Sequence, residues 1–362
     1  MAYTNIDDPS AYFQTKVYTG SNANQSITND GNSDLQPDFI FASYRTLPPY
    51  TNHRAIIDSS RGRAKILESD TAAAEATTTL PAYDLVSFDT NGFTVGPVNS
   101  TSALNASGIS HVAWQWKANG GTTVSNTDGA TTTTVQANQD AGFSIVTWTG
   151  NGATTTIGHG LGVEPYVIIQ KARGTTSNWA VYHKDATNGQ QPYNVATYLN
   201  LTDATGIASN SWGTAASDIN SNTFYLKYWF NYNTTNVAYC FSPIKGFSQF
   251  GSYRGNQDSN GMMCYCSFRP AWVMIKKASG TGPWNIFDSK RDGYNIDYLP
   301  TIQANTTGAE FSNVLQSIDI LSNGFKIRTN QADINQSNQQ YFYMAFAENP
   351  FVTSTGVPTT AK

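Results

Sequence analysis

Phe143-Ser-Ile-Val-Thr-Trp-Thr-Gly150 is the stretch that decides the fold, because the chain repeats it. A second copy is Phe247-Ser-Gln-Phe-Gly-Ser-Tyr-Arg-Gly255, and a weaker third copy is Phe13-Gln-Thr-Lys-Val-Tyr-Thr-Gly20. An apolar strand that begins at a proline follows each copy: Pro37-Asp-Phe-Ile-Phe41, Pro165-Tyr-Val-Ile-Ile169 and Pro270-Ala-Trp-Val-Met274. Self-similarity of this kind indicates an architecture of repeated units.

Further landmarks follow in the same order within each copy. A second aromatic strand comes next, then a short alternating strand, and each copy closes on another aromatic strand. The copies begin near Phe13, Phe143 and Phe247, so each unit has the size of an independent domain. Solenoid and propeller repeats are much shorter.

Period-two patterning identifies the units as β-sheet. Along residues 143–148, Phe, Ile and Thr alternate with Ser, Val and Trp, so the two sets face opposite ways on a strand. Asn91-Gly92 and Asn323-Gly324 tolerate the positive φ that tight hairpins need. No stretch carries the apolar spacing of a sustained helix. We therefore predict an all-β chain of tandem β-sandwich domains, jelly-roll or lectin-like in type.

The domain boundaries follow from the repeats and from composition. Residues 117–140 are rich in Thr, Gly and Asn, which is typical of an extended connector, although the threonine run that ends at Val135 could add a strand to a sheet edge. The link between copies two and three is short, so we expect these two to form a tight pair and copy one to be more separate. The predicted β-sandwich repeats are residues 1–116, 141–245 and 246–350, followed by a C-terminal arm at 351–362.

Composition narrows the function. Charged residues make up 13% of the chain, against about 25% in typical proteins, and aromatic residues also make up 13%. This neutral, polar composition suits extracellular or virion β-proteins, and many secreted β-sandwiches share it. The net charge is −4 and no basic stripe is present, so we expect no nucleic-acid partner. No segment is apolar enough to span a membrane and no signal peptide begins the chain, so we expect a soluble protein without membrane insertion.

The three cysteines are Cys240, Cys264 and Cys266. The last two lie two residues apart on a predicted strand and cannot readily form a disulfide there. We expect buried free thiols, as in a reducing compartment. The alternative is a metal site, but no histidine lies close in sequence to supply a further ligand.

Motifs for catalysis or ligand binding are scarce. Gly158-His-Gly-Leu-Gly162 resembles a phosphate-binding loop, but a strand follows it where a helix is required, so we interpret it as a turn. Asn29-Asp-Gly-Asn-Ser-Asp34 resembles a calcium loop but lacks the bidentate glutamate. A depolymerase would need paired carboxylates in a cleft, and no pairing is visible. We therefore expect no catalytic residues, no metal, no cofactor and no enzymatic activity.

One polar motif recurs, as Asp58-Ser-Ser-Arg61 and Asp288-Ser-Lys-Arg291. A serine beside an aspartate could serve nucleophilic chemistry, but no histidine is tied to it by a motif. We interpret both as turns closed by Asp and Ser side chains, with the arginine bracing the turn as an ion pair. His53 and His183 take roughly equivalent strand positions in copies one and two.

These motifs resemble a known protein family. Further strings that carry the resemblance are Trp114-Gln-Trp-Lys-Ala-Asn-Gly120, Phe268-Arg-Pro-Ala-Trp-Val-Met-Ile-Lys276 and Ala345-Phe-Ala-Glu-Asn-Pro-Phe351. The family is that of repeat-containing virion and tail-associated structural proteins of tailed phages, of the marine type. The resemblance covers nearly the whole chain, implies a virion part assembled in the host cytoplasm, and brings no catalytic residues. The chain departs from the pattern in copy two, where residues 212–232 are unusually aromatic.

Two functions follow as hypotheses. The first is a non-enzymatic structural component of a phage virion, in the tail, a tail fibre or elsewhere on the particle surface. It would assemble with other virion proteins, form a homo-oligomer such as a trimer, and contact the host. The alternative is a lectin-like receptor-binding module for a host-surface glycan. Interfaces favour aromatic residues, and our interface or ligand candidates are Trp212, Tyr225, Tyr228, Trp229, Phe230 and Tyr232.

Overall fold

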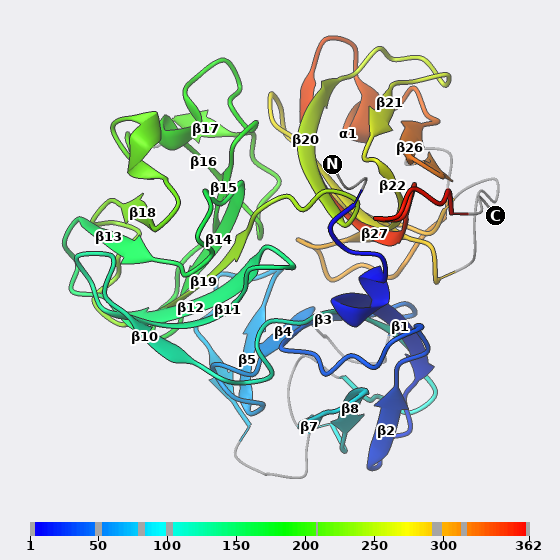
Figure 1. Cartoon of the computed structure of the whole chain (residues 1–362), viewed down its shortest axis with the longest axis horizontal. Helices are drawn as coiled ribbons and strands as arrows, with labels where there is room; N and C mark the ends of the chain where they lie inside the picture. The colour runs from blue at the N-terminus through cyan, green and yellow to red at the C-terminus, as the bar shows by residue number, and fades with distance from the viewer. Residues whose placement is uncertain are drawn as a thin grey trace.

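The computed structural model describes residues 4–47, 53–78, 84–98, 104–207, 209–291, 299–312 and 317–359. Antiparallel strands dominate these residues, and among them α1 (Ala332–Asn335) is the single α-helix. The predicted all-β sandwich fold is confirmed. Three units follow one another along the chain and appear as three lobes in Figure 1.

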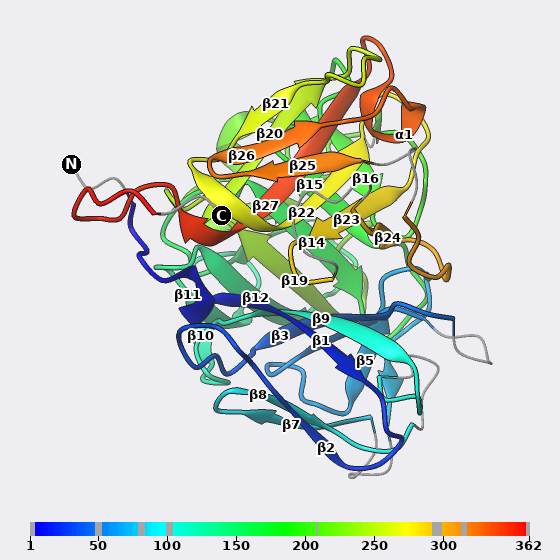
Figure 2. The ribbon, with the colours of Figure 1, turned by 90° about the vertical axis from the view of Figure 1, so that its right-hand side faces the viewer.

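The first unit contains a six-stranded sheet, β1-β9-β3-β4-β5-β6, and a three-stranded sheet, β2-β8-β7. Its elements are η1 (Pro9–Ala11), β1 (Phe13–Thr19), β2 (Gln25–Thr28), β3 (Phe39–Tyr44), β4 (Ala55–Asp58), β5 (Lys65–Glu68), β6 (Ala76–Thr77), β7 (Leu85–Asp89), β8 (Gly92–Val95) and β9 (Ser110–Trp116). In Figure 2 the small sheet lies on the side of β1, β3 and β9 that faces away from the third unit.

The second unit contains an eight-stranded sheet, β10-β11-β12-β19-β14-β15-β16-β17, and the pair β13-β18. Its elements are β10 (Val124–Asn126), β11 (Thr133–Asn138), β12 (Phe143–Thr149), β13 (Thr155–Gly158), β14 (Val167–Ala172), β15 (Ala180–His183), η2 (Pro192–Asn194), β16 (Val195–Tyr198), β17 (Gly206–Ile207), η3 (Ala216–Asp218), β18 (Thr223–Leu226) and β19 (Thr235–Phe241).

The third unit contains a five-stranded sheet, β20-β27-β22-β23-β24, and a three-stranded sheet, β21-β26-β25. Besides α1, its elements are β20 (Ser248–Arg254), β21 (Met263–Tyr265), β22 (Phe268–Lys277), β23 (Trp284–Asp288), β24 (Ile302–Gln303), β25 (Ile318–Leu321), β26 (Gly324–Ile327) and β27 (Gln340–Pro350).

One strand order recurs in the three large sheets. The corresponding stretches are β1-β9-β3-β4-β5, β12-β19-β14-β15-β16 and β20-β27-β22-β23-β24. When the five strands of each stretch are numbered along the chain, the last strand lies between the first and the second, and the third and fourth strands follow. The hydrogen-bond register then aligns the units residue by residue. Corresponding positions on the last strands are Trp116, Phe241 and Phe346. Their partners on the next strands are Phe39, Val167 and Trp272. The residue boundaries of the three repeats stay a prediction.

Each large sheet is buried on both faces. Every residue of β3, β14 and β22 is buried. Successive side chains of a strand point to opposite faces, so Phe143 and Ile145 enter a central core, whereas Val146 and Trp148 enter an outer core beneath the small sheet. This double burial explains why the second strands read as almost continuous apolar runs.

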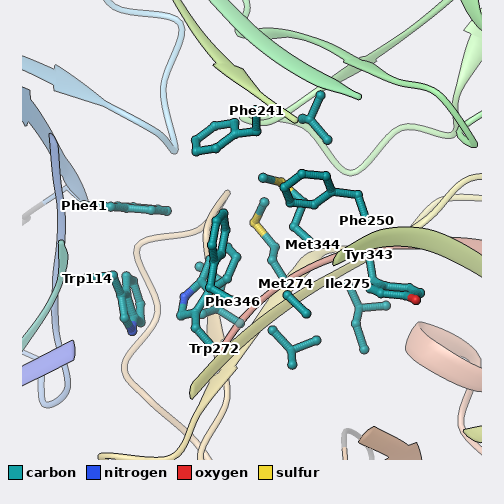
Figure 3. Packing of buried hydrophobic residues seen from close by; sticks show 14 of the residues in the cluster. Phe41, Trp114, Phe241, Phe250, Trp272, Met274, Ile275, Tyr343, Met344 and Phe346 are labelled. Carbon is teal, nitrogen blue, oxygen red and sulfur yellow. The ribbon is translucent and has the colours of Figure 1, made fainter. Parts of the chain in front are cut away.

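The inner faces of the three large sheets share the central core. Phe41 and Trp114 reach it from the first unit, Phe241 from the second, and Trp272 and Met344 from the third (Figure 3). The expectation that the first repeat is more separate is therefore wrong. Its aromatic strands have their largest apolar surface on the inner face, and burial of that surface requires the other two sheets.

The units close a ring through a repeated backbone contact. The Glu75 N–H donates to the Arg173 carbonyl of the second unit at 2.8 Å, and Thr205 donates to Ala278 of the third unit at 2.8 Å. The Glu310 N–H closes the ring by donating at 2.8 Å to the carbonyl of Arg45, in the first unit. We name the contacts between units one and two, two and three, and three and one the first, second and third junctions.

Residues 117–140 and the described part of the C-terminal segment are more ordered than their polar composition suggests. Residues 117–140 contain β10 and β11, and β11 pairs with β12 along Thr134–Asn138, so the stretch expected as a connector extends a sheet edge. The expected C-terminal arm is described as far as residue 359. Within this segment an antiparallel bridge joins Val352 to Pro358, so the chain turns back on itself. Asp7 accepts a hydrogen bond from the Ser354 N–H at 2.6 Å.

Candidate functional site

The aromatic candidates in the second unit divide by burial. Trp212 and Phe230 are 0% and 5% exposed, and their ring centroids lie 5.4 Å apart within the outer core of that unit. Tyr182 packs against Trp212 at 5.9 Å. The structure therefore assigns Trp212 and Phe230 to the core, because they fill the space outside β15 and β14, and neither can meet a partner.

The remaining candidates lie nearer the surface. Tyr225, Trp229 and Tyr232 are half-buried, and Tyr228 is 53% exposed. The Trp229 indole donates to Ser211 Oγ at 2.9 Å, and its ring lies 4.8 Å from that of Tyr228 and 5.5 Å from Lys227 Nζ. The Tyr228 ring thus packs against a Trp229 ring that is held in place by a hydrogen bond. Of the six candidates, Tyr228 has the most exposed side chain.

A buried ion network occupies the first junction. The Asp58 carboxylate accepts hydrogen bonds from the backbone N–H and Nε of Arg61, and from the Tyr239 hydroxyl of the second unit at 2.7 Å. Arg61 also reaches Glu75 at 2.9 Å, and Arg173 of the second unit binds both oxygens of Glu75. Burial raises the pKa of the Glu75 carboxyl, but Arg173 and Arg61 outweigh it, so the pKa is lowered overall.

The third junction repeats this network. Asp288 accepts from the backbone N–H of Arg291 at 3.0 Å, from its Nε at 2.6 Å, and from the Trp114 indole of the first unit at 2.9 Å. Arg291 binds Glu310 at 3.0 Å, and Arg45 of the first unit binds Glu310 at 2.8 Å. The prediction that both Asp–Ser turns are braced by arginine is confirmed. Because these carboxylates accept donors from two units, the networks hold the units together.

Among the residues that the structure describes, the second junction has no such ion network. His183 corresponds to Asp58 and Asp288. Each is the register partner of the residue that lies two positions after the repeated proline of its unit (Pro37, Pro165 or Pro270). The predicted equivalence of His183 with His53 is therefore wrong, and His53 instead contacts Asp70 at 2.8 Å. Buried Ala186 and Ala278 stand where the other junctions carry arginines, so His183 has no ionic partner of that kind.

His183 is held as a neutral ring. Its Nε2 lies 3.1 Å from the Tyr343 carbonyl of the third unit, and its Nδ1 accepts the Asp185 N–H at 3.1 Å. Burial lowers the pKa of His183 to about 4. The hydrogen-bond pattern agrees, since a ring that donates from Nε2 and accepts at Nδ1 is neutral.

The three cysteines lie in the interior of the protein. The predicted buried free thiols are confirmed for Cys240, Cys264 and Cys266, and burial raises the pKa of Cys264 to about 12. Within the described ranges, no group of three His, Cys, Asp or Glu side chains is placed to hold a metal ion. No helix in the described part of the chain is long and apolar enough to cross a membrane.

A polar cavity of about 330 Å³ lies at the third junction. Its walls include Thr15 and Asp30 of the first unit and Arg269, Ala271 and Lys290 of the third. A wider groove of about 860 Å³ lies between the first two units, and an apolar void of about 30 Å³ lies in the central core. Sequence reasoning misses the 330 Å³ cavity, because its walls come from opposite ends of the chain and no local motif links them.

Comparison with known proteins finds a match to one family, and the function of that family is unknown. No curated protein and no solved structure matches the chain. One protein-family model matches residues 8–350, and its description is "Domain of unknown function (DUF7483)".

Proposed function

The chain belongs to the DUF7483 family, whose function is unknown, and we propose that it is a non-enzymatic structural component of a phage virion. The phage assignment rests on the motif resemblance described above. The observation that carries the structural role is the closed ring of three units around one aromatic core. Such a ring has its large sheets buried on both faces, so it behaves as a rigid body that offers its outer lobes to neighbours.

The ring also bears on the partners we propose. One chain already supplies three similar units around a shared centre, as the subunits of a cyclic trimer would. A body of this shape suits contact with other virion proteins in the tail, in a tail fibre or elsewhere on the particle surface. Further self-association, into a homo-oligomer such as a trimer, is part of the same proposal.

The test is to look for the chain in purified particles. Phage particles produced from the genome that encodes the chain are purified by density gradient, and their proteins are quantified by mass spectrometry. We expect the chain at a fixed copy number per particle, and an antibody raised against it to label one position by electron microscopy. Absence from the particles, together with a strictly monomeric mass in solution and no binding to virion proteins, would contradict the proposal.

A lectin-like role is the second candidate, because Tyr228 is exposed beside the Trp229 ring. Exposed aromatic rings stack on the apolar faces of sugars. A glycan array with the wild type and Tyr228→Ala tests this role, with Tyr265→Ala as the matched control, since Tyr265 is 61% exposed on the third unit. We expect Tyr228→Ala alone to weaken binding, and equal binding by both variants would reject the role for this surface.

A further inference from the structure

The three junctions share one position whose occupant differs. Asp38, Tyr166 and Ala271 take equivalent positions in the three units. The backbone carbonyl of each accepts a hydrogen bond from the N–H of the first residue after β4, β15 or β23, respectively. These hydrogen bonds come from Ser59 at 2.9 Å, Lys184 at 3.0 Å and Ser289 at 3.0 Å. Each of these positions lies at the edge of its unit, where the next unit in the ring begins.

At the second junction a large side chain fills this position. The Tyr166 ring centroid lies 6.1 Å from that of Phe250 in the third unit and 5.4 Å from that of His183. Lys184 Nζ covers the Tyr166 ring at 5.9 Å. The space between the units is therefore occupied by the protein's own aromatic side chains.

At the first junction the chain folds over the position. The Asp38 carboxylate accepts the backbone N–H groups of Ala118, Gly120 and Gly121, each at 2.8 Å, and the Ser59 hydroxyl at 2.7 Å. The loop between the first two units thus covers Asp38, and Ala118 and Gly120 of the same loop also line the 860 Å³ groove beside it.

At the third junction the corresponding residue is alanine, and the 330 Å³ cavity lies there. Across the cavity stands Thr15, at the position that Ile145 and Phe250 hold in the other units. Thr15 is 4% exposed, and its Oγ1 is buried without a hydrogen-bond partner. A buried hydroxyl left unpaired destabilises the fold, and here it replaces an apolar side chain, so the site is polar where packing alone favours an apolar residue.

The charges around the cavity balance. Asp30 lies 3.1 Å from Lys16 and 3.2 Å from Lys290, and Arg269 lies 3.5 Å from Glu348. Because each cation stands beside a carboxylate, the site does not favour a net charge on its ligand. Its polar walls offer several hydrogen-bond donors and acceptors, which suits a ligand with several hydroxyl groups.

We propose that the cavity at the third junction binds a neutral saccharide of one or two rings. Its volume of about 330 Å³ lies at the lower end of the range of roughly 300–1,000 Å³ that is usual for small-molecule sites. On binding, rotation of the Thr15 side chain brings Oγ1, which has almost no accessible surface in the free chain, to a sugar hydroxyl, and the small Ala271 leaves room for the ring. This binding activity goes beyond the structural role and does not depend on it, since a chain that contacts no virion protein would still hold the cavity.

Two substitutions take their residues from the protein's own junctions. Ala271→Tyr places in the third unit the side chain that Tyr166 supplies in the second, and we expect it to fill the cavity and abolish binding. Thr15→Val keeps the shape of the side chain and removes the hydroxyl. We expect it to weaken binding at least about tenfold while the melting temperature stays the same or rises, because an unpaired buried hydroxyl is lost.

The probes are an array of neutral glycans, followed by saturation-transfer NMR with the neutral mono- and disaccharides that give signals. Tyr265→Ala is the control, because Tyr265 is exposed and does not line the cavity, and we expect it to bind as the wild type does. Binding lost in both cavity variants and kept in Tyr265→Ala supports the site. No binding of any neutral glycan by the wild type, binding of charged glycans only, or full binding by folded Thr15→Val would each overturn the proposal. Loss in Tyr228→Ala alone would overturn it too, and would assign binding to the Tyr228–Trp229 surface.

Discussion

At the scale of single residues, the aspartates at the first and third junctions decide how the units are joined. Asp288 and Arg291 are both fully buried, and Asp288 also accepts the Trp114 indole from another unit. A buried ion pair is not a large net source of stability. Removal of one member is nevertheless strongly destabilising, since the other is left charged and unpaired in the interior.

We therefore predict that Asp288→Ala lowers the free energy of unfolding by about 3–5 kcal/mol. The measurement is urea denaturation followed by tryptophan fluorescence, which gives the midpoint and the slope. Asp258→Ala is the matched control, because Asp258 is exposed in a loop of the same unit and should change stability by less than about 0.5 kcal/mol. Equal midpoints for the two variants would show that the junction network contributes nothing.

His183 gives the second junction a different response to acid. Its pKa is about 4 in the folded chain, because burial disfavours the charged ring, and about 6.5 in the unfolded chain. Between these values the unfolded chain binds a proton that the folded chain does not, so stability falls as the pH drops from about 6.5 towards 4. When the pH falls below both pKa values, the free energy of unfolding that is lost through His183 is on the order of 3 kcal/mol.

His183→Gln should make the protein less sensitive to acid. The amide of glutamine can donate to the Tyr343 carbonyl as the ring does, but it does not titrate. We expect a shallower loss of stability between pH 6.5 and 4 than in the wild type, measured by denaturation at several pH values. Part of the loss should persist, because burial also lowers the pKa of His111 to about 4. An unchanged pH profile would mean that His183 is not the titrating group.

At the scale of elements, the aromatic segment between β17 and β19 shows how composition misleads about exposure. Trp212 fills the outer core of the second unit, whereas Tyr228 lies 53% exposed a few residues before β19. We predict that Trp212→Ala lowers the free energy of unfolding by about 3–5 kcal/mol, because it leaves a large cavity. Tyr228→Ala should change it by less than about 0.5 kcal/mol. Thermal and urea denaturation of the two variants side by side would measure the contrast, and similar losses in both would contradict the assigned burial.

The same segment marks where prediction from sequence ends. Alternation along residues 143–148 predicts a strand and its two faces, and the Asp–Arg spacing predicts a braced turn, because both are local. Local patterns cannot tell which apolar face meets solvent when both faces of a sheet are buried. Local patterns also do not predict that Arg45 contacts Glu310, or that Thr15 and Ala271 line one cavity, because closure of the ring places these residues together.

At the scale of the whole molecule, stability belongs to the ring as much as to its units. The central core takes aromatic residues from all three large sheets, including Trp116, whose ring lies 5.6 Å from that of Trp272 and 6.5 Å from that of Phe241. A unit removed from the ring would expose the inner face of its large sheet to water. Apolar surface of that size cannot be left exposed without a large loss of stability.

We therefore predict that the chain unfolds in a single cooperative transition, although multidomain proteins of this length commonly unfold in steps. In calorimetry the van't Hoff and calorimetric enthalpies should agree, and fluorescence and circular dichroism should give the same midpoint. Asp58→Ala and Asp288→Ala lie in different units, and each should shift that one transition as a whole. If each variant instead moved a separate transition and left the others in place, the units would be independent domains, and the shared core would not couple them.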